Sequence, residues 1–110
     1  MKSYKGWTGE ERTKSLRKTN EAIRKGIIPP AKKCNRCGQE EGIIQYHNHD
    51  YSDPIKYLEP LCWRCHMILH SEHRAPEACR RYWEAIAAGE RFPPVHKSNL
   101  LILKKDHGID

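Results

Sequence analysis

Two cysteine pairs with the spacing of zinc ligands constrain the fold of this 110-residue chain more than any other feature. Cys34 and Cys37 form the first pair, Cys62 and Cys65 form the second, and 24 residues separate the two pairs. A turn with two cysteines at this spacing can direct both thiolates at one ion, and two such turns complete the tetrahedral shell of a structural zinc site. The sequence therefore predicts a zinc knuckle that joins distant parts of the chain.

The composition indicates that metal binding contributes to the folding free energy. Hydrophobic residues make up 37% of the chain and charged residues 31%, with a single Phe. A chain of this length forms one domain and cannot bury a large apolar core. Zinc binding would supply some of the missing stability.

Disulfides and a redox motif are the competing interpretations of the cysteines. The amino terminus, MKSYKGWTGEERT, has no apolar run of the kind found in a signal peptide or membrane span. We therefore expect a reducing cytosol and no membrane association, which favours metal binding over disulfides. Two Cys-x-x-Cys pairs together also disfavour a redox motif. The fifth cysteine, Cys79, is expected to be a small buried residue.

Positive charge is concentrated in the first third of the chain. Residues 1–33 hold ten Lys or Arg and three Glu, whereas residues 34–110 hold ten Lys or Arg and eleven acidic residues. A concentrated basic segment attracts phosphate through counterion release, which predicts a nucleic acid partner. The alternative is a charged helix face that keeps the protein in solution.

Local signals predict a small α+β, zinc-stabilised domain with flanking helices. Thr8 and Glu11 form a capping-box pattern that begins a helix over residues 9–25. Strands are expected at 43–47 and 55–61, and helices at 62–72 and 76–88. The predicted organisation is a basic helical arm at 1–33, a zinc-bound core at 34–74, and a helix and tail at 75–110.

Three histidines accompany the predicted knuckle. His66 follows the last zinc cysteine directly, and His70 lies four residues later, so both occupy one helical face and can bind one metal ion. His47 lies in the strand that the cysteine pairs would fold against this helix. A histidine pair on an exposed helix is often without function, but a third histidine nearby favours a second metal site.

The segment CNRCGQEEGIIQYHNHDYSDPIKYLEPLCWRCHMILH resembles small phage-borne HNH proteins with four zinc cysteines. In that family an HHxDYSxP strand and turn precedes LCxxCHxxxH, and the resemblance covers residues 34–70. It implies a ββα-metal fold and metal-dependent cleavage of DNA. By the same resemblance, His47, His66 and His70 hold a catalytic Mg²⁺, Mn²⁺, Ni²⁺ or Zn²⁺ ion in addition to the structural zinc.

The chain departs from the family at the general base. That position is Asn48, and an asparagine cannot take up a proton near neutral pH. The family's loop asparagine is also missing, since residues 51–60 contain none. His49 is the candidate replacement base, although strand alternation places it on the same face as His47, where it would serve equally as a ligand.

Two functions are therefore consistent with the sequence. The first is an HNH-like endonuclease in which His49 and His47 are catalytic, with a homodimer as an option for cutting both strands. The second is an inactive zinc protein that binds nucleic acid or inhibits a host defence protein. Both imply the cytoplasm of a phage-infected or prophage-bearing bacterial cell.

Overall fold

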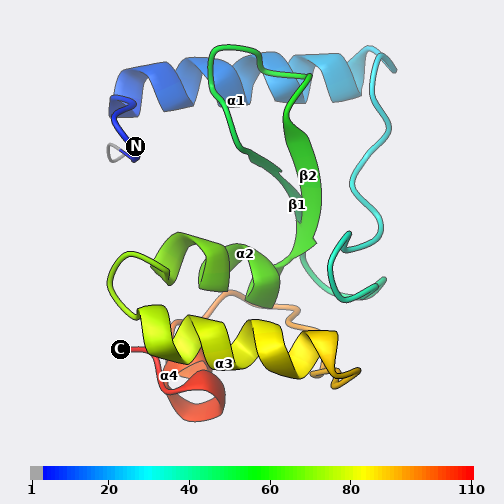
Figure 1. The fold of residues 1–110 in the computed structure, drawn as a ribbon. Helices are drawn as coiled ribbons and strands as arrows, with labels where there is room; N and C mark the ends of the chain where they lie inside the picture. Colours follow the sequence, from blue (N-terminus) through cyan, green and yellow to red (C-terminus); the bar gives the residue numbers. More distant parts are fainter. Residues whose placement is uncertain (1–3) are drawn as a thin grey trace. The chain divides into compact units, whose positions relative to one another are not determined.

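The chain has four helices and a two-stranded sheet in the computed structural model, which describes residues 4–110 (Figure 1). The helices are α1 (Gly9–Arg24), α2 (Trp63–Ser71), α3 (Pro76–Ala87) and α4 (Leu101–His107), and the strands are β1 (Ile44–Asn48) and β2 (Leu58–Cys62). This confirms the predicted small α+β class. Residues 1–3 of the predicted basic arm lie outside the described residues.

The chain forms two compact units. Of the described residues, unit 1 contains 4–30 and 46–59, which include α1 and the far end of the β1–β2 hairpin. Unit 2 contains residues 31–45 and 60–110, which include all four predicted zinc cysteines and helices α2, α3 and α4. Each strand passes from one unit to the other.

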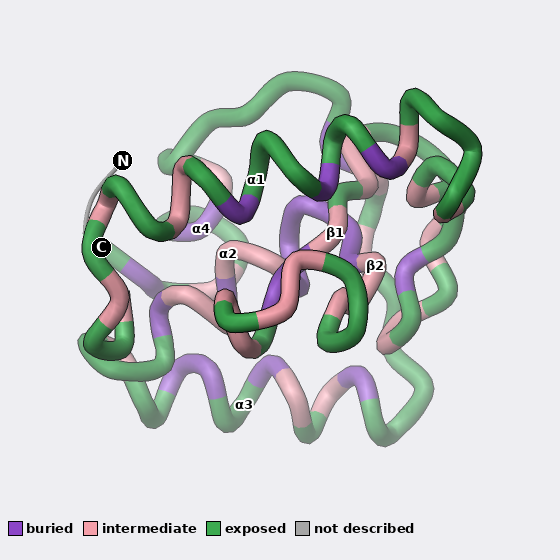
Figure 2. The backbone as a smooth tube through the Cα atoms, turned by 90° about the horizontal axis from the view of Figure 1, so that it is seen from above, coloured by how far each residue is buried: buried purple, intermediate pink, exposed green. Residues whose placement is uncertain are grey.

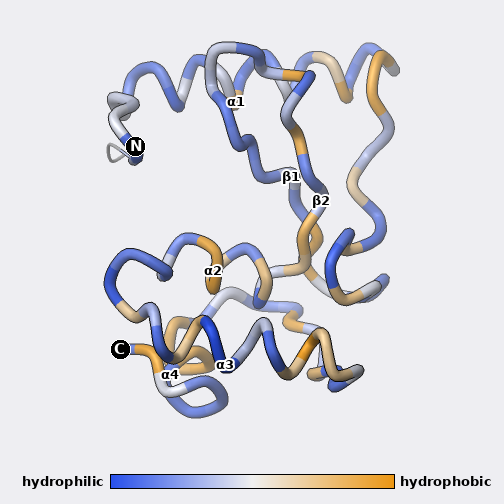
Figure 3. Tube along the Cα trace, viewed as in Figure 1, coloured by the Kyte–Doolittle hydropathy of each residue, from blue (hydrophilic) through white to orange (hydrophobic). Residues whose placement is uncertain are grey.

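The first turn of helix α1 is stabilised by its capping residues. The Thr8 hydroxyl accepts the backbone N–H of Glu11, and the Glu11 carboxylate accepts the N–H of Thr8, each at 3.1 Å, so the predicted capping box forms. The buried positions of α1 are Ser15, Thr19 and Ala22. Most of the helix is hydrophilic (Figure 3). Two of its buried hydroxyls bond to the hairpin: that of Ser15 accepts from the Asn48 amide, and that of Thr19 donates to the Pro54 carbonyl.

The hairpin is antiparallel with a defined register. The His49 N–H donates to the carbonyl of Tyr57, and the Trp63 N–H donates to the carbonyl of Ile43, each at 3.0 Å. Strand β2 begins at Leu58, three residues later than expected. The carboxylate of Asp53 accepts the N–H groups of Ile55 and Lys56, each at 3.0 Å, and this extends the turn.

Unit 2 contains the apolar core. Helices α2, α3 and α4 pack against one another around fully buried side chains, and buried positions recur along α3 (Figure 2). The largest of these side chains are Leu61, Ile68, Leu103 and Ile109. The apolar run at residues 100–103, which falls in the predicted tail, leads into α4 and contributes Leu103 to the core.

One glycine makes a close backbone approach possible in unit 2. The N–H of Ile43 donates to the carbonyl of Val95 at 2.8 Å, and a Cβ atom at Gly42 would lie 2.5 Å from the same oxygen. Gly42 also has a φ of +74°, a conformation that L residues rarely adopt. The segment before β1 is thereby held against the segment before α4.

Candidate metal sites and the histidine face

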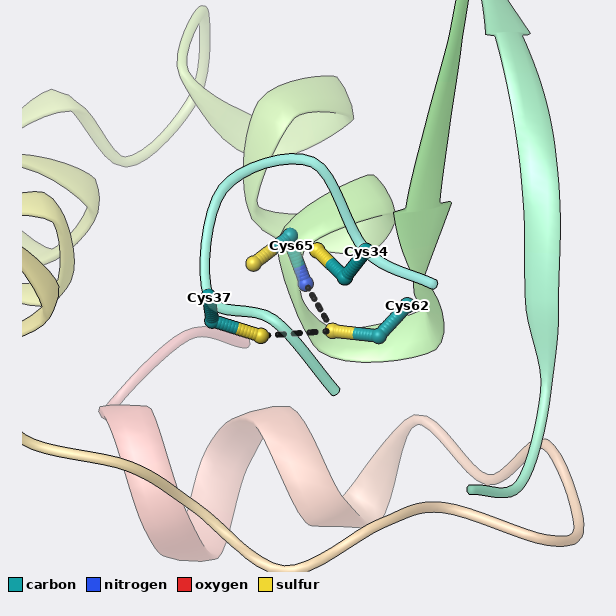
Figure 4. A group of neighbouring side chains, drawn as sticks. All are labelled: Cys34, Cys37, Cys62 and Cys65. Atoms are coloured by element: carbon teal, nitrogen blue, oxygen red, sulfur yellow. Dashed lines mark hydrogen bonds between the residues drawn. The ribbon is translucent and has the colours of Figure 1, made fainter. Parts of the chain in front are cut away.

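The four predicted zinc cysteines converge in unit 2 (Figure 4). Cys34 and Cys37 lie on a turn that closes through Gly38, whose N–H donates to the carbonyl of Cys34 at 3.0 Å. Cys62 is the N-cap of α2, and Cys65 lies in its first turn. All four sulfur atoms lie within 4.8 Å of one another.

The dimensions and chemistry of this cluster fit a tetrahedral zinc ion. Zinc–sulfur bonds of about 2.3 Å at tetrahedral angles place ligand sulfur atoms about 3.8 Å apart. The sulfur atoms of Cys37 and Cys62 are 3.6 Å apart, and Cys34, Cys62 and Cys65 are buried. The four cysteines can therefore hold a structural metal ion such as zinc.

The closeness of the four thiols shifts their pKa values in opposite directions. Hydrogen bonds from the thiols of Cys37, Cys62 and Cys65 hold the pKa of Cys34 well below its usual range. The neighbouring Cys34 thiolate in turn raises the pKa of Cys65. Four thiolates at this distance repel one another, so full deprotonation requires a cation at the centre.

Of two further polar side chains in the core of unit 2, one adjoins the cysteine cluster and the other does not. The hydroxyl of Tyr82 on α3 lies 3.1 Å from the sulfur of Cys65, where it can donate a hydrogen bond to a thiolate ligand. Cys79 is separate from the four ligands, and its thiol donates to the carbonyl of Ile68 at 3.3 Å. Burial raises the pKa of Cys79, which suits an unreactive core residue.

Arg64 is engaged within unit 2. Its side chain is 8% exposed and donates to the carbonyl of Pro93 at 2.9 Å and to the carboxylate of Asp106 at 2.8 Å. The same guanidinium lies 3.0 Å from Nε2 of His107. Arg64 therefore connects α2 to α4, a packing role that leaves little of the side chain for a phosphate.

His66 and His70 lie side by side on α2, as their spacing predicted. Their Nε2 atoms are 3.1 Å apart. Two imidazole nitrogens bound to one ion at distances of 2.0–2.1 Å lie about 2.9 to 3.4 Å apart, depending on octahedral or tetrahedral geometry. The pair is therefore spaced to share either a proton or a metal ion.

His47 and His49 lie on one face of the hairpin in unit 1. Their ring centroids are 4.6 Å apart, with the rings at 79°. His47 is 2% exposed, whereas the His49 side chain is 40% exposed. This is the shared face that strand alternation predicted. His47 belongs to unit 1 and the α2 pair to unit 2, so the three-histidine ion site stays a prediction.

Asn48 lies on the opposite face of β1, directed at α1. Its amide nitrogen donates to the hydroxyl of Ser15 at 3.0 Å and to the carbonyl of Asp53 at 3.4 Å. Its amide oxygen accepts the N–H of Asp50 at 3.0 Å. The residue at the expected base position is thus 7% exposed and occupied in joining the strand, the turn and α1.

Glu59 on β2 was not identified from the sequence. Its Oε1 atom lies 2.7 Å from Nε2 of His49. The hairpin register places Glu59 opposite His47 and diagonal to His49, and diagonal neighbours on one face are within reach of long side chains. The sequence shows a glutamate in the second predicted strand. Pairing it with His49 requires the strand register, which the sequence alone did not supply.

Comparison of the chain with protein-family models, with curated proteins and with solved structures finds no match. Among the described residues, no helix combines the length and apolar character needed to cross a membrane.

Proposed function

We propose that the chain is a metal-dependent endonuclease that hydrolyses phosphodiester bonds of DNA. In this proposal His47, His66 and His70 hold a divalent ion, His49 is the general base, and α1 contacts the DNA backbone. The observation that carries the proposal is the His66–His70 pair, whose nitrogens are 3.1 Å apart at the spacing of two ligands on one ion. The cysteine cluster supports it by anchoring the start of the same helix.

The donor set suits the hydrolysis of a phosphodiester. Imidazole nitrogens bind Zn²⁺, Ni²⁺ and other first-row divalent ions. Such an ion would polarise the scissile phosphate and stabilise the departing oxygen. His49 would accept a proton from the attacking water, whose oxygen bonds to phosphorus as the phosphorus–oxygen bond to the leaving sugar breaks. The leaving oxygen takes a proton from solvent, which gives a phosphate monoester and an alcohol.

The DNA contact is assigned to the exposed basic side of α1. Ser15, Thr19 and Ala22 face inward, whereas Lys14, Arg17 and Lys18 are exposed. Among the described residues, no ion pair is recorded for these three cations. Arg24 and Lys25, by contrast, both pair with Glu21. Three uncompensated cations within two helical turns favour a polyanion as the partner.

A second candidate function is a zinc-bound scaffold without catalytic activity, which binds nucleic acid or a host protein. The observation that favours it is the hydrogen bond from Asn48 to Ser15, because the residue at the expected base position then has a structural role in place of a catalytic one. The two candidates differ in a second metal ion. The nuclease requires one at the histidines, whereas the scaffold requires the cysteine zinc alone.

Plasmid nicking with added Mg²⁺, Mn²⁺, Ni²⁺ or Zn²⁺ tests the nuclease. His66→Ala and His70→Ala should each abolish nicking and binding of a second ion to the zinc-loaded protein, measured by calorimetry. His49→Ala should retain that ion but slow nicking by about 10²- to 10⁴-fold. His96→Ala, an exposed histidine outside both clusters, is the matched control and should match the native protein. Absence of nicking with every ion would overturn the nuclease and favour the scaffold.

A further inference from the structure

His49 and Glu59 form a close pair on the exposed face of the hairpin. His49 Nε2 and Glu59 Oε1 are 2.7 Å apart, at the short end of the range for a nitrogen–oxygen hydrogen bond. The His49 side chain is 40% exposed, but that of Glu59 is 14% exposed. The carboxylate is therefore largely enclosed while the ring that it contacts reaches solvent.

The hairpin register makes this pairing a fixed property of the strands. The His49 backbone N–H donates to the Tyr57 carbonyl, which aligns position 59 diagonally with position 49 on the same face. The ring of His49 also meets that of His47 edge to face, with the centroids 4.6 Å apart. Two contacts, one with Glu59 and one with His47, thus restrict the orientation of the His49 ring.

We propose that Glu59 is the positioning residue of His49, an inference that rests on the base role assigned to His49 in the proposed function. The Nε2–H group donates a hydrogen bond to the carboxylate, so the neutral ring keeps Nδ1 as its hydrogen-bond acceptor. Which nitrogen of a neutral histidine carries the proton is set by the hydrogen bonds that the ring nitrogens make, and a nitrogen that faces a carboxylate keeps the proton. Glu59 thereby fixes both the direction of the ring and the nitrogen that faces the attacking water.

A simple surface ion pair is the competing explanation for this contact. Exposed pairs contribute little to stability and do not hold one geometry. The enclosure of Glu59 and the ring contact with His47 argue against a freely moving pair. The two explanations differ in what happens to the ring nitrogens of His49 when the carboxylate is removed.

Nitrogen-15 spectra of the histidine rings test the pair directly, without any need for activity. At about pH 8 the native protein should show His49 with Nε2 protonated and Nδ1 bare. Glu59→Ala should shift both ring nitrogens of His49 towards the mixed tautomers of a free imidazole. Glu59→Gln, whose amide oxygen still accepts, should keep the native pattern in part. Identical ring shifts in the native protein and Glu59→Ala would overturn the proposal.

Glu41→Ala is the matched control for the loss of one negative charge. Glu41 is exposed and lies in unit 2, so its replacement should leave the His49 ring nitrogens unchanged. A His49 shift of equal size in this variant would indicate a general charge effect and would also overturn the proposal. Backbone spectra of both units report whether either variant remains folded.

The nicking assay then connects the pair to turnover. Glu59→Ala should lower kcat by up to about 100-fold with little change in KM, and Glu59→Gln should recover part of the loss. The concentration of divalent ion that gives half-maximal nicking should stay unchanged. An increase in that concentration would show that Glu59 supports a metal ligand, because carboxylates also orient metal-bound histidines, and would overturn the base assignment. If the native protein does not nick DNA, the proposed function fails, while the ring spectra still decide the pair.

Discussion

The amide of Asn48 donates to the hydroxyl of Ser15 across 3.0 Å, and so joins strand β1 to helix α1 within unit 1. Both residues are buried, with exposed fractions of 7% and 4%. The inward face of α1 offers two hydroxyls and a methyl group in place of large apolar side chains. Hydrogen bonds therefore largely determine how this helix packs against the hairpin.

A double-mutant cycle should detect this hydrogen bond. Ser15→Ala and Asn48→Ala should each lower the free energy of unfolding by about 1 to 3 kcal/mol, since each leaves a buried polar group with fewer partners. The double variant should cost less than the sum, with a coupling of about 1 kcal/mol. Chemical denaturation of the zinc-loaded protein measures all four species. Strict additivity would show that the two side chains do not interact.

Asn48→His tests whether a histidine at the expected base position can act as a base. Because Asn48 is directed at Ser15, on the face opposite His47 and His49, the new ring would enter the packed boundary with α1. We expect a loss of about 1 to 3 kcal/mol in stability and no gain in nicking. The decisive measurement is nicking by the Asn48→His, His49→Ala double variant. Recovery of activity there would place the base at position 48 and contradict this orientation.

Local signals in the sequence predicted much of the fold, and longer-range relationships account for the rest. The capping box joins Thr8 to Glu11, three residues later, and each cysteine pair has the same spacing. Both patterns could therefore be recognised from the sequence. The partner of Asn48 lies 33 residues away on a helix with few apolar residues to indicate its inward face. Similarly, Glu59 meets His49 through a strand register that the turn at Asp53 determines.

Zinc removal should unfold unit 2. A structural zinc ion contributes on the order of 10 kcal/mol to the folding free energy of small domains. The core around Ile68 contains few large, fully buried apolar side chains to replace that contribution. Cys37→Ala should therefore lose stoichiometric zinc, measured by metal analysis, and lose the helical signal of α2. Cys79→Ala removes an identical thiol outside the cluster and should keep both zinc and fold. Full zinc occupancy in Cys37→Ala would rule out the four-cysteine site.

Protonation of His107 should destabilise unit 2 in mild acid. Burial, and then the Arg64 guanidinium, lower the pKa of His107, while Asp106 opposes the shift. Below about pH 6.5 the unfolded chain therefore binds more protons than the folded one, so the free energy of unfolding decreases as the pH is lowered. Between pH 7.5 and 5.5, unfolding experiments should show a smaller loss for His107→Gln than for the native protein. His96→Gln, at an exposed position, should retain the native pH dependence, and the same loss in all three proteins would contradict this prediction.

Salt dependence should identify the DNA-binding surface. If Lys14, Arg17 and Lys18 contact phosphates, the affinity for duplex DNA should fall steeply with salt, because each contact releases about 0.9 counterion. The triple alanine variant should bind more weakly, and its slope of log affinity against log salt should be shallower by up to about three. Alanine at Lys97, Lys104 and Lys105 removes three exposed cations from unit 2 and should leave the slope unchanged. Fluorescence anisotropy over a salt series measures both slopes, and a native slope in the α1 variant would exclude this face as the contact.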